Sequence, residues 1–147
     1  MPVSRADRRF ALARAAGRCE YCRVRGWPLT IDHIIPRQRF KSPDGADGAS
    51  LPSADGSDNL AAACGLCNRA KSNATTSYDP RTQREQPLFN PRRQRWEDHF
   101  RWSADLLRVV GITPCGRATV QRLRLNREEY RQQRALLRAA MRGGGPD

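Results

Sequence analysis

Two Cys-x-x-Cys pairs constrain the fold of this chain more strongly than any other feature. They are Cys19 with Cys22 and Cys64 with Cys67. Each pair can place two sulfur atoms on one side of an ion, so the two pairs together complete the tetrahedral shell that Zn²⁺ prefers and leave no open coordination position. We therefore expect a structural Zn²⁺ site that ties two distant points of the sequence together. A redox-active dithiol or four unrelated thiols are the alternatives.

The length and charge of the chain narrow its class. With 147 residues it has about the size of one domain, near the size at which a metal adds useful stability. Its 27 Lys+Arg against 15 Asp+Glu give a net charge of +12, which favours nucleic acid as a partner because binding releases condensed counterions. Nearly all the cations are arginine, whose planar fork matches pairs of phosphate oxygens, although a GC-rich genome produces the same bias. A solvated basic surface is the alternative interpretation.

The N-terminus and the hydropathy of the chain predict a soluble, cytoplasmic protein. Residues 1–10 lack the apolar core of a signal peptide, and no stretch approaches the roughly 20 apolar residues of a membrane span. In a reducing compartment, paired cysteines bind metals more often than they form disulfides. We expect no membrane partner and infer no obligate protein partner. The fifth cysteine, Cys115, is expected to be a small buried apolar residue.

The N-terminal half of the chain predicts a helix and then a strand. Apolar and basic residues alternate at helical spacing over residues 5–16, and Gly17 ends the pattern. Residues 29–35 are rich in β-branched side chains and bounded by prolines, which predicts a strand carrying Asp32 and His33. Neighbours on a strand point to opposite faces, so both side chains serve one site only where the strand ends. We predict a strand-to-loop junction at this pair.

The rest of the chain predicts a loop, a hairpin and three helices. The predicted loop is a mobile surface segment, because it consists mainly of Gly, Pro, Ser, Ala and Asp and has almost no apolar side chain to bury. Further along the chain, two strands joined by a turn are predicted to form a hairpin. One helix is predicted before this hairpin and two after it. The ranges are 42–58 for the loop, 68–72 for the first helix, 75–90 for an irregular segment, 99–103 and 107–112 for the hairpin strands, and 116–125 and 127–142 for the last two helices.

The order of the motifs resembles the HNH endonucleases, also called His-Me finger or ββα-metal nucleases. The matching residues run Cys-x-x-Cys, Asp-His-Ile-Ile-Pro, Asn-Leu and Cys-x-x-Cys-Asn-x-x-Lys over residues 19–71, about a third of the chain. The segment 88–119 also resembles the tails of small prokaryotic HNH proteins. The resemblance implies an α+β fold and one nuclease domain over 1–147. Its implied parts are an N-terminal helix (1–18), a zinc-stapled ββα-metal core (19–75) and a C-terminal extension with a hairpin and basic helices (76–147).

The Asp-His pair has the chemistry that phosphodiester hydrolysis needs. That reaction requires a base for the attacking water, a cation for the charge on the phosphate, and stabilisation of the departing 3′ oxygen. An imidazole takes a proton from water near neutral pH, so His33 is a candidate general base. Asp32 offers a hard oxygen ligand for a divalent ion. The alternative is that His33 is an ordinary polar residue beside a zinc knuckle.

The resemblance implies a role for each polar residue of the motif. His33 is implied as the general base, Asp32 and Asn68 as ligands of one catalytic divalent ion, and Asn59 as a clamp on the base-bearing loop. Asn68 stands where His is common, an HNN pattern, and its harder amide oxygen favours Mg²⁺ or Mn²⁺. The implied products carry 5′-phosphate and 3′-hydroxyl ends. The alternatives are that Asn59 caps a helix starting at Leu60 and that Asn68 is a solvent-facing polar residue.

Basic residues near the second knuckle and in the tail are candidates for contact with DNA. They are Arg69, Lys71, Arg92, Arg93 and Arg95. The predicted sequence preference is weak or unknown, because no recognition motif such as a helix-turn-helix is evident. His99 lies among aromatic residues, where packing is the expected role, and it is a second candidate for the site. A zinc-stabilised nucleic-acid-binding protein without catalysis is the alternative function.

Overall fold

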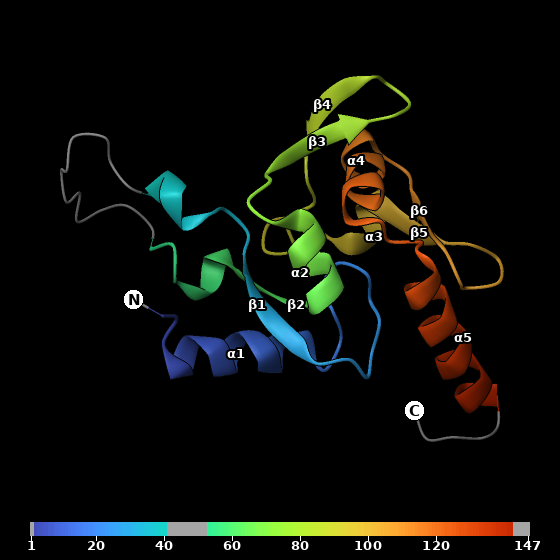
Figure 1. Ribbon diagram of the computed structural model, residues 1–147, viewed down its shortest axis with the longest axis horizontal. Coiled ribbons are helices and arrows are strands. Elements are labelled where there is room, and N and C mark those ends of the chain that lie inside the picture. Colours follow the sequence, from blue (N-terminus) through green and yellow to red (C-terminus); the bar gives the residue numbers. More distant parts are fainter. Residues whose placement is uncertain (1, 41–52, 143–147) are drawn as a thin grey trace.

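The computed structural model describes residues 2–40 and 53–142. Most of the predicted mobile loop, residues 42–52, lies outside the described residues, and residues 53–56 form a turn that leads into a 3-10 helix beginning at Ser57. The order of elements along the chain is shown in Figure 1. These elements are α1 (Arg5–Ala15), β1 (Leu29–His33), η1 (Arg37–Phe40), η2 (Ser57–Asn59), β2 (Leu60–Cys64), α2 (Gly65–Lys71), β3 (Thr76–Asp79), β4 (Arg84–Pro87), α3 (Trp96–His99), β5 (Phe100–Trp102), β6 (Val109–Gly111), α4 (Pro114–Leu123) and α5 (Glu128–Arg142).

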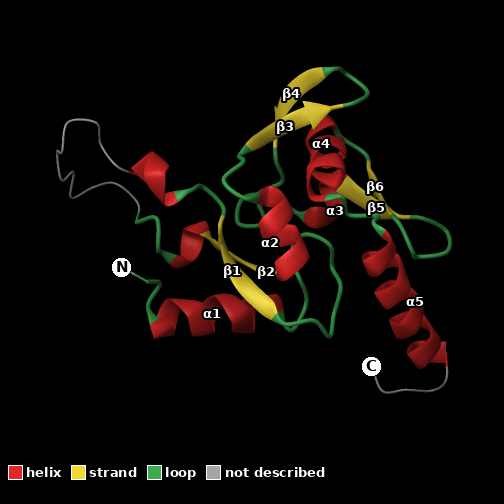
Figure 2. Cartoon of the chain, viewed as in Figure 1, coloured by secondary structure: helices red, strands yellow, loops and turns green. Residues whose placement is uncertain are grey.

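Helices and small sheets alternate along the chain, which confirms the α+β class (Figure 2). The described residues contain three two-stranded antiparallel sheets, β1–β2, β3–β4 and β5–β6. None is wide enough to form a core of its own, so the helices and loops supply the remaining buried surface. Within the described segments, no helix is both long and apolar enough to cross a bilayer.

The first helix ends where the sequence predicts. The Ser4 side chain accepts a hydrogen bond from the Asp7 amide at 3.0 Å, which caps the N-terminus, and the Asp7 carboxylate lies near the positive end of the helix dipole. The backbone of Ala16 turns into the left-handed region at φ 53°, which ends the helix. Ala11 and Ala15 are buried on the side of α1 that packs on β2.

The strand β2 is the most buried element of the sheet that carries the Asp-His pair. Every residue of β2 is buried, and the register with β1 pairs His33 with Leu60. Its other edge is also covered, because the Glu20 amide donates to the Ala62 carbonyl at 2.9 Å and a Glu20 carboxylate oxygen accepts from the Ala62 amide at 2.8 Å. These bonds on both edges outweigh the helical preference of the alanines, so the alternative of a helix starting at Leu60 is wrong.

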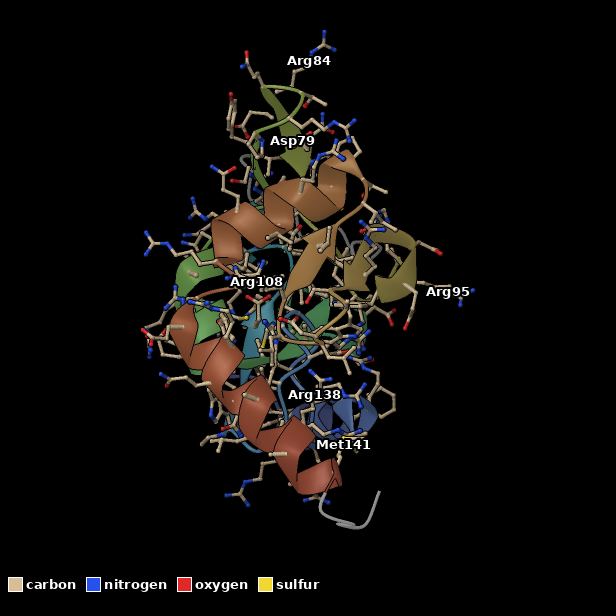
Figure 3. All side chains as sticks on the ribbon, turned by 90° about the vertical axis from the view of Figure 1, so that its right-hand side faces the viewer. Asp79, Arg84, Arg95, Arg108, Arg138 and Met141 are labelled. Carbon is tan, nitrogen blue, oxygen red and sulfur yellow. The ribbon has the colours of Figure 1, made fainter. Side chains whose placement is uncertain are left out.

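Residues 75–90, expected to be irregular, instead form the β3–β4 hairpin. Its strands are largely exposed and lack alternating apolar residues, so the usual strand signal is missing from the sequence. The buried Asp79 carboxylate holds the turn by accepting from the Arg81 amide at 3.0 Å, and it pairs with the Arg117 guanidinium of α4 at 3.0 Å. Asp79 and Arg84 pair with each other beside the turn of the hairpin, and the Arg84 side chain extends away from α4 (Figure 3).

The C-terminal elements follow the sequence predictions closely. The hairpin β5–β6 and the helices α4 and α5 all form, with Thr113 capping α4 and Pro114 in its first turn. The first hairpin strand begins at Phe100 because His99 completes the short helix α3. A Cβ atom at Gly116 would lie 2.0 Å from the His99 carbonyl oxygen, so this close approach of α4 to the end of α3 requires glycine.

Candidate functional site

The two cysteine pairs come together in one buried cluster. The Sγ atoms of Cys19, Cys22, Cys64 and Cys67 all lie within 4.8 Å of one another, and none of these cysteines is in a disulfide. The Cys22 and Cys64 sulfurs are 3.9 Å apart. Four sulfurs around a tetrahedral Zn²⁺ at the usual Zn–S length are separated by about 3.8 Å, so the cluster fits a closed structural zinc site.

Helix α5 closes one side of this cluster. The Tyr130 hydroxyl lies 3.2 Å from the Cys67 sulfur, and burial together with the neighbouring sulfurs raises the pKa of Tyr130 well above its ordinary value. The hydroxyl therefore remains a donor to sulfur. One turn further along α5, the buried Arg134 guanidinium donates to the Cys22 carbonyl at 3.1 Å. Cys115 is buried elsewhere, as the sequence predicts.

The predicted strand-to-loop junction is present, because His33 is the last residue of β1. Its Nε2 atom lies 2.8 Å from Asp55 Oδ1, which also accepts from Arg37 Nε at 2.8 Å. The bonds from Arg37 and His33 lower the pKa of Asp55. A carboxylate can only accept, so in this pair Nε2 carries the proton and Nδ1 of a neutral His33 keeps its lone pair. Asp55 is the site residue that the sequence reasoning missed, because it lies in a loop without a motif.

Asp32 points away from Asp55, into the interface between β1 and α2. The residue is only 2% exposed, and its carboxylate accepts from the Tyr21 hydroxyl at 2.7 Å and from the Lys71 ammonium at 3.2 Å. Burial raises the pKa of Asp32, and the Lys71 charge and the Tyr21 hydrogen bond oppose that rise. The Asp32 carboxylate therefore forms a buried ion pair with the Lys71 ammonium.

Lys71 is not on the surface, where the sequence analysis places it as a candidate phosphate contact. It is 1% exposed, and besides Asp32 its ammonium donates to the carbonyls of His33 at 3.2 Å and Ile34 at 3.1 Å. The Lys71 ammonium already donates to three oxygen atoms and is almost fully buried, so a phosphate group cannot reach it. The structure therefore corrects this expectation, because the positive charge of Lys71 neutralises Asp32 and anchors the chain after β1.

Asn59 joins the segment after His33 to the loop before β2. Its Oδ1 accepts from the Ile35 amide, and its Nδ2 donates to the carbonyls of Ile35 and Ala54, each at 2.9 Å. Its own carbonyl accepts from the Ile34 amide at 2.9 Å. These four bonds hold the backbone directly after His33 and directly before Asp55 in one conformation.

Asn68 faces β1 from α2. Its Nδ2 donates to Thr30 Oγ1 at 2.8 Å and to the Ile31 carbonyl at 3.2 Å. Within the described ranges no hydrogen bond uses its Oδ1, and none joins the side chains of His33, Asp32 and Asn68 to one another. Asp32 and Asn68 thus share the interface of β1 with α2, whereas His33 at the strand end faces Asp55.

Comparison with known proteins identifies the segment that contains all these residues. Residues 19–74 match the family described as HNH endonuclease. This segment is an HNH domain. The comparisons with curated proteins and with solved structures give no match. The elements β1, β2 and α2 all lie inside the matched residues, which confirms the expected ββα-metal core with a four-cysteine site.

The arginines expected to contact DNA differ in their solvent exposure and in whether they form an ion pair. Arg69 is exposed on α2 of the HNH domain, and Arg93 and Arg95 are exposed after β4, with Arg95 extending into solvent (Figure 3). In the described part of the chain, no ion pair involves these three. Arg92 is instead paired with the Glu20 carboxylate, which holds the C-terminal extension against the first knuckle.

His99 is packed, as its aromatic surroundings predict. Its Nδ1 atom lies 2.7 Å from Thr113 Oγ1, and its ring centroid is 6.0 Å from that of Phe89. Trp96 and Phe100 continue the aromatic cluster, with centroids 5.0 Å apart. This histidine therefore belongs to the packing between α3 and α4 and not to the HNH site.

Replacing Lys71 by methionine should destabilise the HNH domain by about 3–5 kcal/mol, because it leaves the Asp32 charge buried without a partner. Urea unfolding of the Lys71→Met variant measures this loss. The double variant Lys71→Met with Asp32→Asn removes both charges, so most of the loss should be recovered. Equal stability of wild type and Lys71→Met would show that the pair contributes nothing.

Replacing Asn59 by alanine should cost about 1–3 kcal/mol, because the half-buried Ile35 amide and two carbonyls lose their partner. Thermal unfolding of Asn59→Ala measures the cost. Asn73→Ala is the matched control, since it makes the same change at an exposed asparagine of the HNH domain. An Asn59→Ala variant as stable as Asn73→Ala would contradict the role assigned to the Asn59 hydrogen bonds.

Proposed function

We propose that this protein is a metal-dependent DNA endonuclease in which His33 is the general base and Asp32 and Asn68 hold one divalent cation. The observation that carries the proposal is the position of His33 in an HNH domain, at the end of β1, with Nε2 bound to Asp55 and Nδ1 left as the basic nitrogen. A purely structural histidine has no need of this arrangement.

The proton transfer follows from this geometry. His33 Nδ1 accepts a proton as the oxygen of a water molecule bonds to phosphorus, and the bond from phosphorus to the 3′ oxygen breaks. The departing 3′ oxygen takes a proton from solvent, so the products carry 5′-phosphate and 3′-hydroxyl ends. Asp55 stabilises the imidazolium from the other side of the ring at 2.8 Å. Asn59 keeps the segment after His33 in place while the charge changes.

A hard divalent ion at the β1–α2 interface would compete with hydrogen bonds that the fold already makes. Asp32 and the Oδ1 atom of Asn68 are oxygen donors of the kind that Mg²⁺ and Mn²⁺ prefer. Because Asp32 is only 2% exposed and its carboxylate accepts from Tyr21 and Lys71, the ion would bind there only if the Lys71 ammonium moved aside. A bound divalent cation would neutralise charge on the phosphate and on the departing oxygen. The four sulfurs form a separate site whose Zn²⁺ is structural.

We propose that the whole chain acts as one nuclease unit on DNA. Contacts between the C-terminal extension and the HNH domain support this unit: Trp96 Nε1 donates to the Tyr21 carbonyl at 3.0 Å, and Tyr130 contacts Cys67. The net charge of +12 supports a polyanionic partner, bound through its backbone with little sequence preference. A cytoplasmic location stays a prediction.

One observation favours a second function, that of a zinc-stabilised nucleic-acid-binding protein without catalysis. Lys71 already neutralises Asp32, which is what a purely structural pair would do. A duplex labelled at either end separates the two functions. With Mg²⁺ or Mn²⁺ the nuclease should yield fragments with 5′-phosphate and 3′-hydroxyl ends, whereas the binding protein should retard the duplex in a gel and leave it whole.

Replacing Asp55 by asparagine should slow cleavage by about ten- to hundredfold, because the amide stabilises the imidazolium less and permits the other tautomer of His33. Asp55 acts through His33 and is therefore a positioning residue. Single-turnover rates and DNA affinities of Asp55→Asn measure the effect, and we expect the rate to fall while the affinity holds. A fall in affinity alone would assign Asp55 to DNA binding.

A further inference from the structure

A cleft lined by basic residues lies on the opposite side of α2 from the residues that are proposed to be catalytic. Asn68 and Lys71 face β1, whereas Leu66, Arg69 and Ala70 face α4 and line a cleft of about 510 Å³. Figure 1 shows α2 between β1 and α4, and β3 completes the cleft with Ser77. The cleft therefore shares its helix with the HNH site without overlapping it.

Four arginines line this cleft, Arg69, Arg122, Arg124 and Arg127. No carboxylate lines it, and no ion pair in the described segments involves any of the four. Four like charges around one open cleft repel one another unless an anion is bound between them. Three of the four lie outside residues 19–74, so the C-terminal extension adds them to the HNH domain.

Two of these arginines are held in place by the fold. Arg122 Nε donates to the Ala70 carbonyl at 3.0 Å, which joins α4 to the end of α2. The Arg127 guanidinium lies 5.8 Å from the centre of the Tyr130 ring, and Tyr130 in turn contacts the cysteine cluster. Arg69 and Arg124 are exposed. The cleft thus has a fixed wall and two side chains free to close on a ligand.

We propose that this cleft binds the phosphodiester backbone of the DNA that the HNH site cleaves, and so positions it along α2. Guanidinium groups bind phosphate oxygens in pairs, and an open cleft with four of them suits several successive phosphates. The proposal rests on the proposed function for its substrate. Its test uses binding alone, so the two can fail separately.

The test compares two double variants that each remove two positive charges. Arg69→Gln with Arg124→Gln changes the cleft, and Arg8→Gln with Arg9→Gln changes two exposed residues of α1, far from α4 in Figure 1. Fluorescence anisotropy measures the affinity of each zinc-loaded protein for a labelled duplex over a range of salt concentrations, without divalent ions. The cleft variant should bind about tenfold more weakly, and its salt slope should shrink by about 1–2 relative to wild type.

Each outcome bears on one of the two proposals. A cleft variant that matches the α1 variant in affinity and slope overturns the cleft proposal, even if wild type cleaves DNA. Wild type that binds through the cleft and never cuts overturns the nuclease and leaves the cleft proposal standing. Arg69→Lys with Arg124→Lys keeps the charge and loses the paired guanidinium contacts, so its affinity should lie between those of wild type and the glutamine variant, whereas an affinity below that of the glutamine variant would overturn the role of charge in the cleft. Displacement of the duplex by micromolar inorganic pyrophosphate would assign the cleft to a small phosphate compound and overturn the DNA assignment.

Discussion

Substitution of His33 by alanine should slow DNA cleavage by about 10²–10⁴-fold, because a positioned base contributes that much to proton transfer. The loss should appear in the single-turnover rate at saturating protein. Affinity for DNA should change little, since the side chain is half-buried and paired with Asp55 instead of standing free on the surface.

The matched control for this variant is His99→Ala. His99 is the only other histidine, and it contacts Thr113 and Phe89 instead of the HNH site. Its loss should leave the cleavage rate within a few fold of wild type when the protein is folded. Equal rates for wild type and His33→Ala would remove the general base from the mechanism.

Loss of the structural Zn²⁺ should unfold much of the protein. A structural zinc site contributes on the order of 10 kcal/mol of binding free energy, comparable to the whole stability of a small domain. Cys67→Ser removes one sulfur from the cluster and a partner of Tyr130, so both the HNH domain and α5 should lose their fixed conformation. Metal analysis and thermal unfolding should show less than one Zn²⁺ per chain and a weak, broad transition.

Cys115→Ser provides the control for the zinc prediction. It is the same chemical change at a buried cysteine outside the cluster. This variant should keep one Zn²⁺ per chain and a cooperative transition, with only the modest cost of a polar group in the core. Full stability of a zinc-free wild type would contradict the role of the cluster.

Strong local signals made much of the fold predictable from the sequence. Ser4 and Gly17 bound α1, the prolines at 28 and 36 bound the strand that carries the Asp-His pair, and Thr113-Pro114 begins α4. The β3–β4 hairpin escaped prediction because it is held by Asp79 and Arg117, a contact between distant residues, and not by an apolar pattern. Secondary-structure propensities depend only on residues that are close in the sequence, so they do not predict such tertiary contacts.

The candidate site was predictable in its residues and less so in its contacts. The motif order located His33, Asp32, Asn59 and Asn68, but the Asp55 partner of His33 comes from a loop without a motif. The sequence also did not predict the burial of Lys71, because a lysine on a short helix is usually exposed. Only the packing of α2 on β1 brings this lysine to Asp32.

The central claim is that the HNH domain of this chain hydrolyses DNA with a divalent cation. Incubation of supercoiled plasmid with zinc-loaded wild-type protein, with and without added Mn²⁺, tests it most directly. We predict nicked and linear plasmid only when Mn²⁺ is present. Plasmid that stays supercoiled in Mn²⁺ while the same protein retards it in a gel would contradict the claim.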